Sequence, residues 1–197
     1  MASHKADTKR ERLVELENRM KKHFAQKFPQ SQLWFFKDRS GVVDGYSGTE
    51  PVMFVGERPS LGGDVAGPGR VGRVRHSDQV VGRFYGRLKE YGFARAHVTD
   101  IVKEQMRAGV PSYEQVERNW PFFREELSIV EPAVVVALGK WVFETLEQRL
   151  ERASPLLKFT HYAYRFKSRS VLEQIFRKDF QRLRMALANT RTAQPCR

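Results

Sequence analysis

The fold is decided by the stretch Pro51-Val52-Met53-Phe54-Val55-Gly56-Glu57-Arg58-Pro59-Ser60, in which a short apolar run ends in a glycine and an acid follows. The run has the length and β-branched content of a buried strand. Gly56 lets the backbone turn sharply or approach a ligand closely. The stretch therefore predicts Glu57 at the carboxyl end of a central strand, which is the edge where open α/β sheets bind ligands. A solvated turn acid is the alternative for Glu57.

Strands and helices alternate along the rest of the chain. Apolar, β-branched runs predict three further strands at 96–102, 133–138 and 156–160. This alternation predicts an α/β fold, a four-stranded parallel sheet flanked by helices on both faces. The predicted helices are 77–92, 113–118, a separate one beginning at Pro121, 140–150 and 170–188, with an amphipathic helix at 5–27 before the first strand.

The length of 197 residues and the hydrophobic content of 41% suit one domain with extensions. We expect residues 1–50 to form an N-terminal helical extension packed on the domain, 51–188 the α/β domain and 189–197 a disordered tail. No apolar run approaches the ~18 residues of a membrane span, and the N-terminus lacks an apolar stretch of signal-peptide type. We therefore expect no membrane partner and no secretion.

Cysteine usage limits the cofactors that the chain could hold. Cys196 is its single cysteine, so a disulfide within the chain is impossible. A zinc or iron–sulfur site ligated by a cluster of cysteines is excluded for the same reason. No spacing of histidines and acids indicates a metal site either. We predict neither a metal nor another cofactor.

The positive charge is concentrated in two blocks of the chain. The formal net charge is +12. Residues 158–197 contain ten Lys and Arg but two Asp and Glu, and residues 58–107 contain ten against five. In residues 108–157 the acids outnumber the bases. This uneven distribution of positive charge favours a polyanionic partner, and nucleic acid is the first candidate. A basic protein without such a partner is the alternative.

Three polar residues fall at the carboxyl ends of predicted strands: Glu57, Asp100 and His161. They come from distant parts of the sequence, but parallel strands would bring them to one edge of the sheet. Asp100 could instead form a plain ion pair with Lys103 or a nearby Arg, and His161 could be a surface residue that ends its strand.

Two further segments could contact a nucleic acid. Residues 67–76 contain a literal G-x-G-x-x-G, but it does not link a strand directly to a helix, so it does not indicate dinucleotide binding. It is better interpreted as a glycine-rich loop whose Arg70, Arg73 and Arg75 contact phosphates. The adjacent aromatics at 34–36 could stack on bases, although core packing is the favoured interpretation.

Four motifs, in order, resemble those of the uracil-DNA glycosylase superfamily. Gly56–Ser60 resembles the G-E-x-P-G motif of its iron–sulfur class, and Val98–Lys103 resembles the I-T-N-x-V-K strand of that class. Ala133–Gly139 resembles a third strand that ends in L-G. Thr160–Arg165 occupies the place of the motif H-P-S-x-x-x-R. The resemblance covers about Val52–Ala188, and it implies the same four-stranded parallel sheet.

The resemblance implies a DNA repair glycosylase that flips uracil or another deaminated base out of DNA and hydrolyses its N-glycosidic bond. Glu57 would hold and polarise the attacking water, and His161 would stabilise the departing base. The residues implied to bind the base are Gly56, Asp100 and Tyr85. Those expected to contact DNA are Arg70, Arg73 and Arg75 of the glycine-rich loop, and Tyr162, Tyr164, Arg165, Lys167 and Arg169 of a wedge loop.

The chain also departs from the family pattern. Asp100 stands where the family has Asn, and an ionised Asp only accepts hydrogen bonds. Our hypothesis is that Asp100 is protonated or selects a base edge rich in donors. The glycine-rich loop lacks a stacking Phe, which Tyr85 or His76 could replace. His161 is not followed by Pro-Ser, and the cluster cysteines are missing.

These departures leave alternatives open. A non-catalytic DNA-binding relative with the same fold is the main one, and an enzyme acting on free nucleosides or nucleotides is a weaker one. Residues 162–166 alternate in polarity, so a fifth edge strand competes with the wedge loop. We expect a monomer that meets DNA, single- or double-stranded, in the nucleoid of the cytoplasm or in a nucleus.

Overall fold

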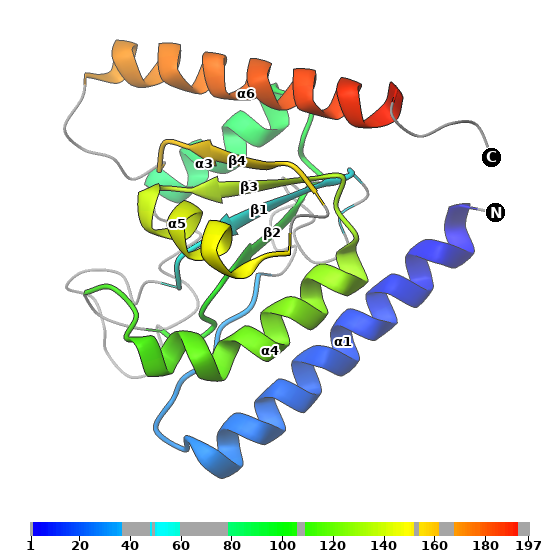
Figure 1. The fold of residues 1–197 in the computed structure, drawn as a ribbon, viewed down its shortest axis with the longest axis vertical. Coiled ribbons are helices and arrows are strands. Elements are labelled where there is room, and N and C mark those ends of the chain that lie inside the picture. Colours follow the sequence, from blue (N-terminus) through cyan, green and yellow to red (C-terminus); the bar gives the residue numbers. More distant parts are fainter. Residues whose placement is uncertain are drawn as a thin grey trace.

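The computed structural model describes residues 2–36, 48, 50–59, 79–105, 109–151, 154–161 and 168–192. Its centre is a four-stranded sheet in the order β2-β1-β3-β4, in which every pair of neighbours is parallel (Figure 1). The predicted α/β fold is confirmed. The strands are β1 (Val52–Gly56), β2 (His97–Asp100), β3 (Val134–Leu138) and β4 (Leu156–Phe159).

Helices cover both faces of the sheet, as predicted. On one face lie α4 and α5, with α1 packed along the outer side of α4; α3 and α6 cover the other (Figure 1). No helix in the described ranges combines the length and apolarity needed to cross a membrane. The helices are α1 (Ala2–Lys27), α3 (Gln79–Glu90), α4 (Tyr113–Val130), α5 (Lys140–Arg149) and α6 (Arg169–Thr192).

The central strand β1 is buried on both faces because its side chains alternate between two cores. Met53 and Val55 belong to the core under α4 and α5, whereas Val52 and Phe54 belong to the core under α3 and α6. The ring of Phe54 meets four aromatic neighbours with centroids 5.8–6.3 Å apart, within the range of favourable aromatic pairs. The apolar run thus packs helices onto both sides of the sheet.

One predicted boundary is wrong. The sequence predicts one helix over 113–118 and another beginning at Pro121, but α4 runs unbroken from Tyr113 to Val130. Ser112 caps its amino end, in a capping box with Gln115. An interior proline removes one backbone hydrogen bond, which costs about 3 kcal/mol. The helix continues because buried side chains lie on both sides of the proline, among them Val116, Trp120, Phe123 and Ile129.

The C-terminal helix is longer than expected. α6 continues to Thr192, past position 188 where the sequence predicts the domain to end. Phe180 and Leu183 are fully buried against the sheet core, and Asp179 accepts a hydrogen bond from the backbone N–H of Thr160 at 3.1 Å. Residues 193–197 of the predicted tail lie outside the described part of the chain.

Because the strands are parallel, their carboxyl ends lie at one edge of the sheet. These ends are Gly56, Asp100, Leu138 and Phe159. The residues that follow them include the predicted Glu57 and His161. The topology therefore places the predicted site residues along a single edge.

Candidate active site

Gly56 and Asp100 are paired across β1 and β2. A Cβ atom built on Gly56 would lie 2.2 Å from Oδ1 of Asp100, far inside van der Waals contact. The Asp100 carboxyl group therefore lies directly over the backbone of residue 56, and any side chain there would displace it. Glycine at this position is required by the close approach of the acid, which is buried.

Glu57 follows β1 directly and is half-buried. Its Oε1 lies 3.4 Å from Nε of Arg58, whose guanidinium also donates to the carbonyl of Gly109 at 3.0 and 2.6 Å. Burial raises the pKa of the Glu57 carboxyl above its usual value, Arg58 opposes this, and nearby Asp100 raises the pKa further. Glu57 is thus a carboxylate made more basic by its surroundings, as a catalytic base requires.

His161 follows β4 and is half-buried. A Cβ built on Gly139 would lie 3.5 Å from Cβ and 3.7 Å from Cδ2 of His161, so the imidazole lies against the start of α5. Gly139 has a φ of +104°, which L side chains rarely adopt. Since β3 separates β1 from β4, Glu57 and His161 follow strands that are roughly 10 Å apart, two strand spacings.

A small pocket brings together the three residues predicted to bind the base. Gly56, Asp100 and Tyr85 line it, and its volume is about 10 Å³. The other lining residues are Phe36, Phe84, Val98, Thr99 and Leu138. The pocket thus joins apolar and aromatic walls to the carboxyl group of Asp100. The role of these residues in binding a base stays a prediction.

A buried polar network lies on the opposite face of β2, under α4. Lys103 donates its ammonium protons to Oε2 of Glu126 and to the backbone carbonyl of Asp100, both at 2.6 Å, and to the Thr99 hydroxyl. Oε1 of Glu126 lies 2.9 Å from Nε2 of His97 and accepts from Thr99 at 2.8 Å. The ion pair that Lys103 makes is therefore with Glu126. This network fixes the backbone beneath the candidate site.

The network also controls the ionisation of Glu126. Burial by itself raises the pKa of this carboxyl, but Lys103 and His97 outweigh burial and lower the pKa to about 2. Glu126 is consequently ionised in the folded protein throughout the neutral range. Sequence reasoning missed this network because nothing in the separate motifs shows that α4 presents an acid to β2.

Most of the predicted DNA contacts lie outside the described residues. They are Arg70, Arg73, Arg75, Tyr162, Tyr164, Arg165 and Lys167, together with His76, the second candidate for stacking on the base. Arg169 begins α6, and its side chain is not described. The possible fifth strand over 162–166 also lies outside the described part.

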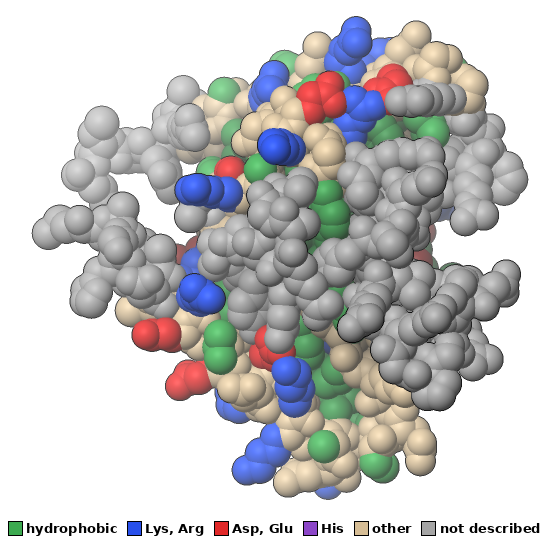
Figure 2. Space-filling model, turned by 180° about the vertical axis from the view of Figure 1, so that it is seen from behind, with side chains coloured by type: hydrophobic (Ala, Val, Ile, Leu, Met, Phe, Trp, Pro, Cys, Tyr) green, Lys and Arg blue, Asp and Glu red, His purple; other side chains and the backbone are tan. Residues whose placement is uncertain are grey.

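The described part of α6 presents a basic surface. Arg177, Lys178, Arg182 and Arg184 are exposed, and Figure 2 shows Lys and Arg side chains at the end of the molecule where α6 lies, with acids among them. Arg182 also donates to the carbonyl of Lys158 at 2.9 Å, and Arg184 to that of Tyr91 at 3.1 Å. These guanidinium groups are held against the fold and remain accessible to a polyanion.

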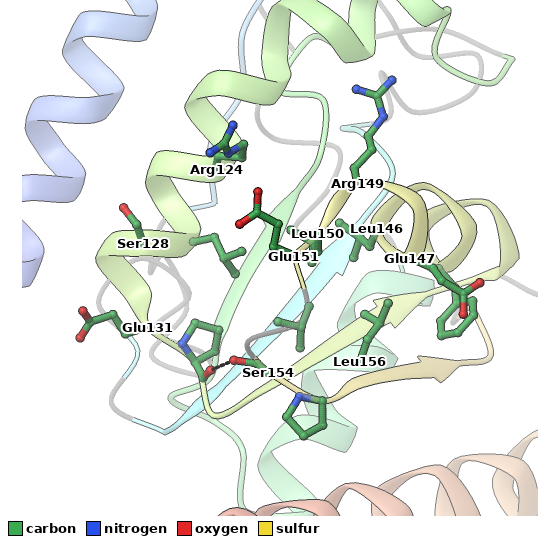
Figure 3. Close-up of a pocket in the computed structure, with 15 residues that line it drawn as sticks. Arg124, Ser128, Glu131, Leu146, Glu147, Arg149, Leu150, Glu151, Ser154 and Leu156 are labelled. Atoms are coloured by element: carbon green, nitrogen blue, oxygen red, sulfur yellow. Dashed lines mark hydrogen bonds between the residues drawn. The ribbon is translucent and has the colours of Figure 1, made fainter.

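A larger cavity, of about 950 Å³, lies between α4 and α5 near the amino ends of β3 and β4 (Figure 3). At its margin the hydroxyl of Ser154 donates to the carbonyl of Pro132 at 2.9 Å. None of the predicted site residues lines this cavity. Ligands of open α/β sheets bind at the carboxyl ends of the strands, so the edge with Glu57, Asp100 and His161 is the better candidate.

The residues described by the structure contain no group of three or more His, Cys, Asp or Glu placed to hold a metal ion. A family model, that of the uracil DNA glycosylase superfamily, matches residues 44–186, which include all four strands of the sheet. The match confirms the resemblance drawn from the four motifs. No curated protein matches the chain at a significant level.

Proposed function

Because the chain belongs to the uracil-DNA glycosylase superfamily, we propose that it is a DNA repair glycosylase acting on uracil or another deaminated base. It hydrolyses the N-glycosidic bond as a monofunctional enzyme, with water as the nucleophile, and leaves an abasic site. One observation carries the proposal. Glu57, a carboxylate of raised pKa, stands at the carboxyl edge beside a pocket that contains Gly56, Asp100 and Tyr85.

Glu57 acts on the attacking water. In its ionised form the carboxylate accepts a hydrogen bond from the water and orients the water's oxygen toward C1′ of the flipped nucleotide. Its raised pKa strengthens this hold, because a more basic carboxylate attracts the water's proton more strongly. The hydrogen bond from the backbone N–H of Val102 to the carbonyl of Glu57, at 3.1 Å, fixes the residue on the sheet edge.

His161 acts on the leaving base. As the glycosidic bond breaks, negative charge develops on the base, and a positioned donor beside a base oxygen stabilises that charge. His161 lies two strands from Glu57, with the imidazole held against Gly139. Glu57, after β1, thus acts on the nucleophile, and His161, after β4, acts on the leaving group at the same edge of the sheet.

Contacts with the DNA backbone come from the basic segments. The exposed Arg177 and Lys178 of α6, together with the glycine-rich loop, hold phosphates without reading sequence. The segment after His161 enters the duplex and fills the gap left by the flipped nucleotide. The protein works as a monomer where genomic DNA is found, in a nucleoid or a nucleus.

One assay tests this function. Single- and double-stranded oligonucleotides with one uracil, hypoxanthine or xanthine are incubated with the protein, and abasic sites are scored by alkaline cleavage. Abasic sites in at least one substrate, and none in the undamaged control, are expected. Salt-sensitive binding without any abasic site would show instead a non-catalytic DNA-binding relative. Release of base from free deoxyuridine alone would show a nucleoside enzyme.

Asp100→Asn is expected to increase uracil excision. Uracil presents an N3–H donor beside the O4 acceptor, and an ionised Asp can satisfy the donor but repels the acceptor. An Asn amide accepts from N3–H and donates to O4. A hydrogen bond gained in this way contributes about 1–1.5 kcal/mol, so kcat/KM on uracil DNA should rise roughly tenfold at pH 7.5. A steady-state comparison with the wild-type protein measures the gain.

The same substitution is expected to move the acid limb of the pH–rate profile. Glu57 must be ionised to act, so activity falls as the pH drops through its raised pKa. Asp100 contributes to that raised pKa, and an uncharged Asn lowers it. The limb should therefore move to lower pH. An unchanged limb together with no gain on uracil would contradict the role given to Asp100.

A further inference from the structure

The segment that precedes the matched family region is fixed along the continuation of β2. Leu33 forms an antiparallel bridge with Glu104. The backbone N–H of Trp34 donates to the carbonyl of Lys103 at 2.9 Å, and that of Gln105 donates to the carbonyl of Gln32 at 2.8 Å. An antiparallel register carries the chain back along β2 as residue numbers rise. The segment therefore runs from Glu104 toward Asp100.

A segment that runs in this direction places Phe36 at the candidate base pocket. Phe36 lines that pocket together with Gly56, Asp100 and Tyr85. Its ring meets the ring of Tyr85 edge-on, with centroids 6.5 Å apart and planes at 86°, and meets Trp34 at 4.6 Å and 78°. Two aromatic rings in edge-to-face contact thus form part of the lining of the pocket that contains Asp100.

The pocket is too small for a base. Its volume of about 10 Å³ suffices for roughly one water molecule. Phe84 and Val98, on the inner side, are buried in the sheet core and cannot move without disrupting it. Phe36 and Tyr85 are only half-buried. They are therefore the walls that can separate to admit a flat ring.

Building on the proposed function, we propose that Phe36 forms the stacking wall of the base pocket. Its ring moves away from Tyr85 and lies on one face of the extrahelical base while Asp100 contacts the edge of that base. The ligand is a planar heteroaromatic ring, held by stacking that does not depend on its edge. Position 36 lies outside residues 44–186, so the N-terminal extension adds a wall that the family match does not contain.

The neighbouring residue offers a matched control. Phe35 is half-buried like Phe36, but it faces α1: Nζ of Lys21 lies 5.6 Å from the centre of its ring. It lines a separate small pocket with Leu13, Leu16 and Met20. Phe35→Leu therefore removes an aromatic ring from the same segment without changing the base pocket.

The experiment compares Phe36→Leu, Phe36→Tyr and Phe35→Leu in single-turnover excision of the base that the wild-type protein releases. Loss of base stacking is expected to reduce excision by Phe36→Leu roughly tenfold to a hundredfold at subsaturating protein, and Phe36→Tyr should restore it. Phe35→Leu should remain within about twofold of wild type. Thermal melting of each variant checks that it is folded.

A second readout does not require turnover. In a Trp120→Phe, Trp141→Phe, Glu57→Gln background, Trp34 is the remaining tryptophan and contacts the Phe36 ring. Its emission should change more with uracil-, hypoxanthine- or xanthine-bearing oligonucleotides than with undamaged DNA. Phe36→Leu should remove the difference.

The outcomes separate the inference from the proposed function. Excision by Phe36→Leu equal to that of wild type would overturn the stacking role and leave the glycosylase function standing. If wild type releases no base, the glycosylase function fails. In that case, a Trp34 emission change that is larger with damaged DNA and is lost in Phe36→Leu would still support a base pocket. Equal emission changes with damaged and undamaged DNA would overturn the stacking role as well.

Discussion

Glu57→Gln is expected to reduce the rate of base excision by roughly 10²–10⁴-fold, the contribution of a positioned catalytic base. Gln keeps the size of the side chain but cannot accept the proton of the attacking water. Single-turnover kinetics on the best substrate measure the loss of the chemical step. Binding to the same oligonucleotide should change little, because Glu57 acts on water rather than on phosphates. A matched control is Glu144→Gln, an exposed acid of α5 that should leave the rate unchanged.

The thermal stability of Glu57→Gln distinguishes a loss of catalysis from a folding defect. Burial raises the pKa of Glu57, which means that the folded protein disfavours the ionised form. Ionised Glu57 therefore lowers stability at pH values above its ordinary pKa, and a neutral Gln removes that cost. The melting temperature of Glu57→Gln at pH 7 should be no lower than that of wild type. Excision at the wild-type rate would exclude Glu57 as the catalytic base.

Lys103→Met is expected to destabilise the fold by about 3–5 kcal/mol, the cost of leaving a buried charge without its partner. Lys103 is 5% exposed and Glu126 is 7% exposed, and their charged atoms lie 2.6 Å apart. Urea unfolding at pH 7 measures the loss. The control is Lys140→Met, since Lys140 is exposed and its pairing with Glu144 contributes at most about 1 kcal/mol.

The stability lost in Lys103→Met should depend on pH in a defined direction. In wild type the pKa of Glu126 is lowered to about 2, so its stabilising contribution is present above its ordinary pKa and is lost as the pH falls toward 2. Without Lys103 burial dominates, which favours protonated Glu126 and raises its pKa. The stability difference between variant and wild type should therefore shrink as the pH is lowered.

A double variant distinguishes the charge from the loss of packing. Lys103→Met/Glu126→Met replaces both charges with apolar side chains and should recover more than half of the stability lost in Lys103→Met. Failure to recover would indicate that Lys103 acts mainly through the carbonyl of Asp100, to which it donates at 2.6 Å. Stability equal to wild type in Lys103→Met would contradict the importance of the pair.

The network links stability to the candidate site through the backbone of β2. His97 and Thr99 point to Glu126 under α4, whereas Val98 lies in the core on the other face and Asp100 reaches the base pocket. The side chains of β2 therefore alternate between the buried network and the pocket side, although Thr99 also contributes to the lining of the pocket.

Local pattern and topology made much of the fold predictable. The apolar runs at Val52–Gly56 and Val134–Leu138 are buried on both faces, and such strands need helices on both sides. Parallel strands bring their carboxyl ends to one edge, which predicts Glu57, Asp100 and His161 along that edge; the pairing of β1 with β2, which makes Glu57 and Asp100 neighbours, comes from the structure. These features depend on residues that are close in sequence and on the rule that parallel strands end at the same edge of a sheet.

By itself the sequence determined the parallel sheet, the edge that carries the acids and the histidine, and the resemblance to a glycosylase family. The tertiary structure alone decided that the Asp100 carboxyl lies over Gly56, that Lys103 pairs with Glu126, and that Phe36 reaches the pocket. The physical reason is the distance along the chain over which each effect acts. Periodicity and strand chemistry act over a few residues, whereas these contacts join segments far apart in the chain through register and packing.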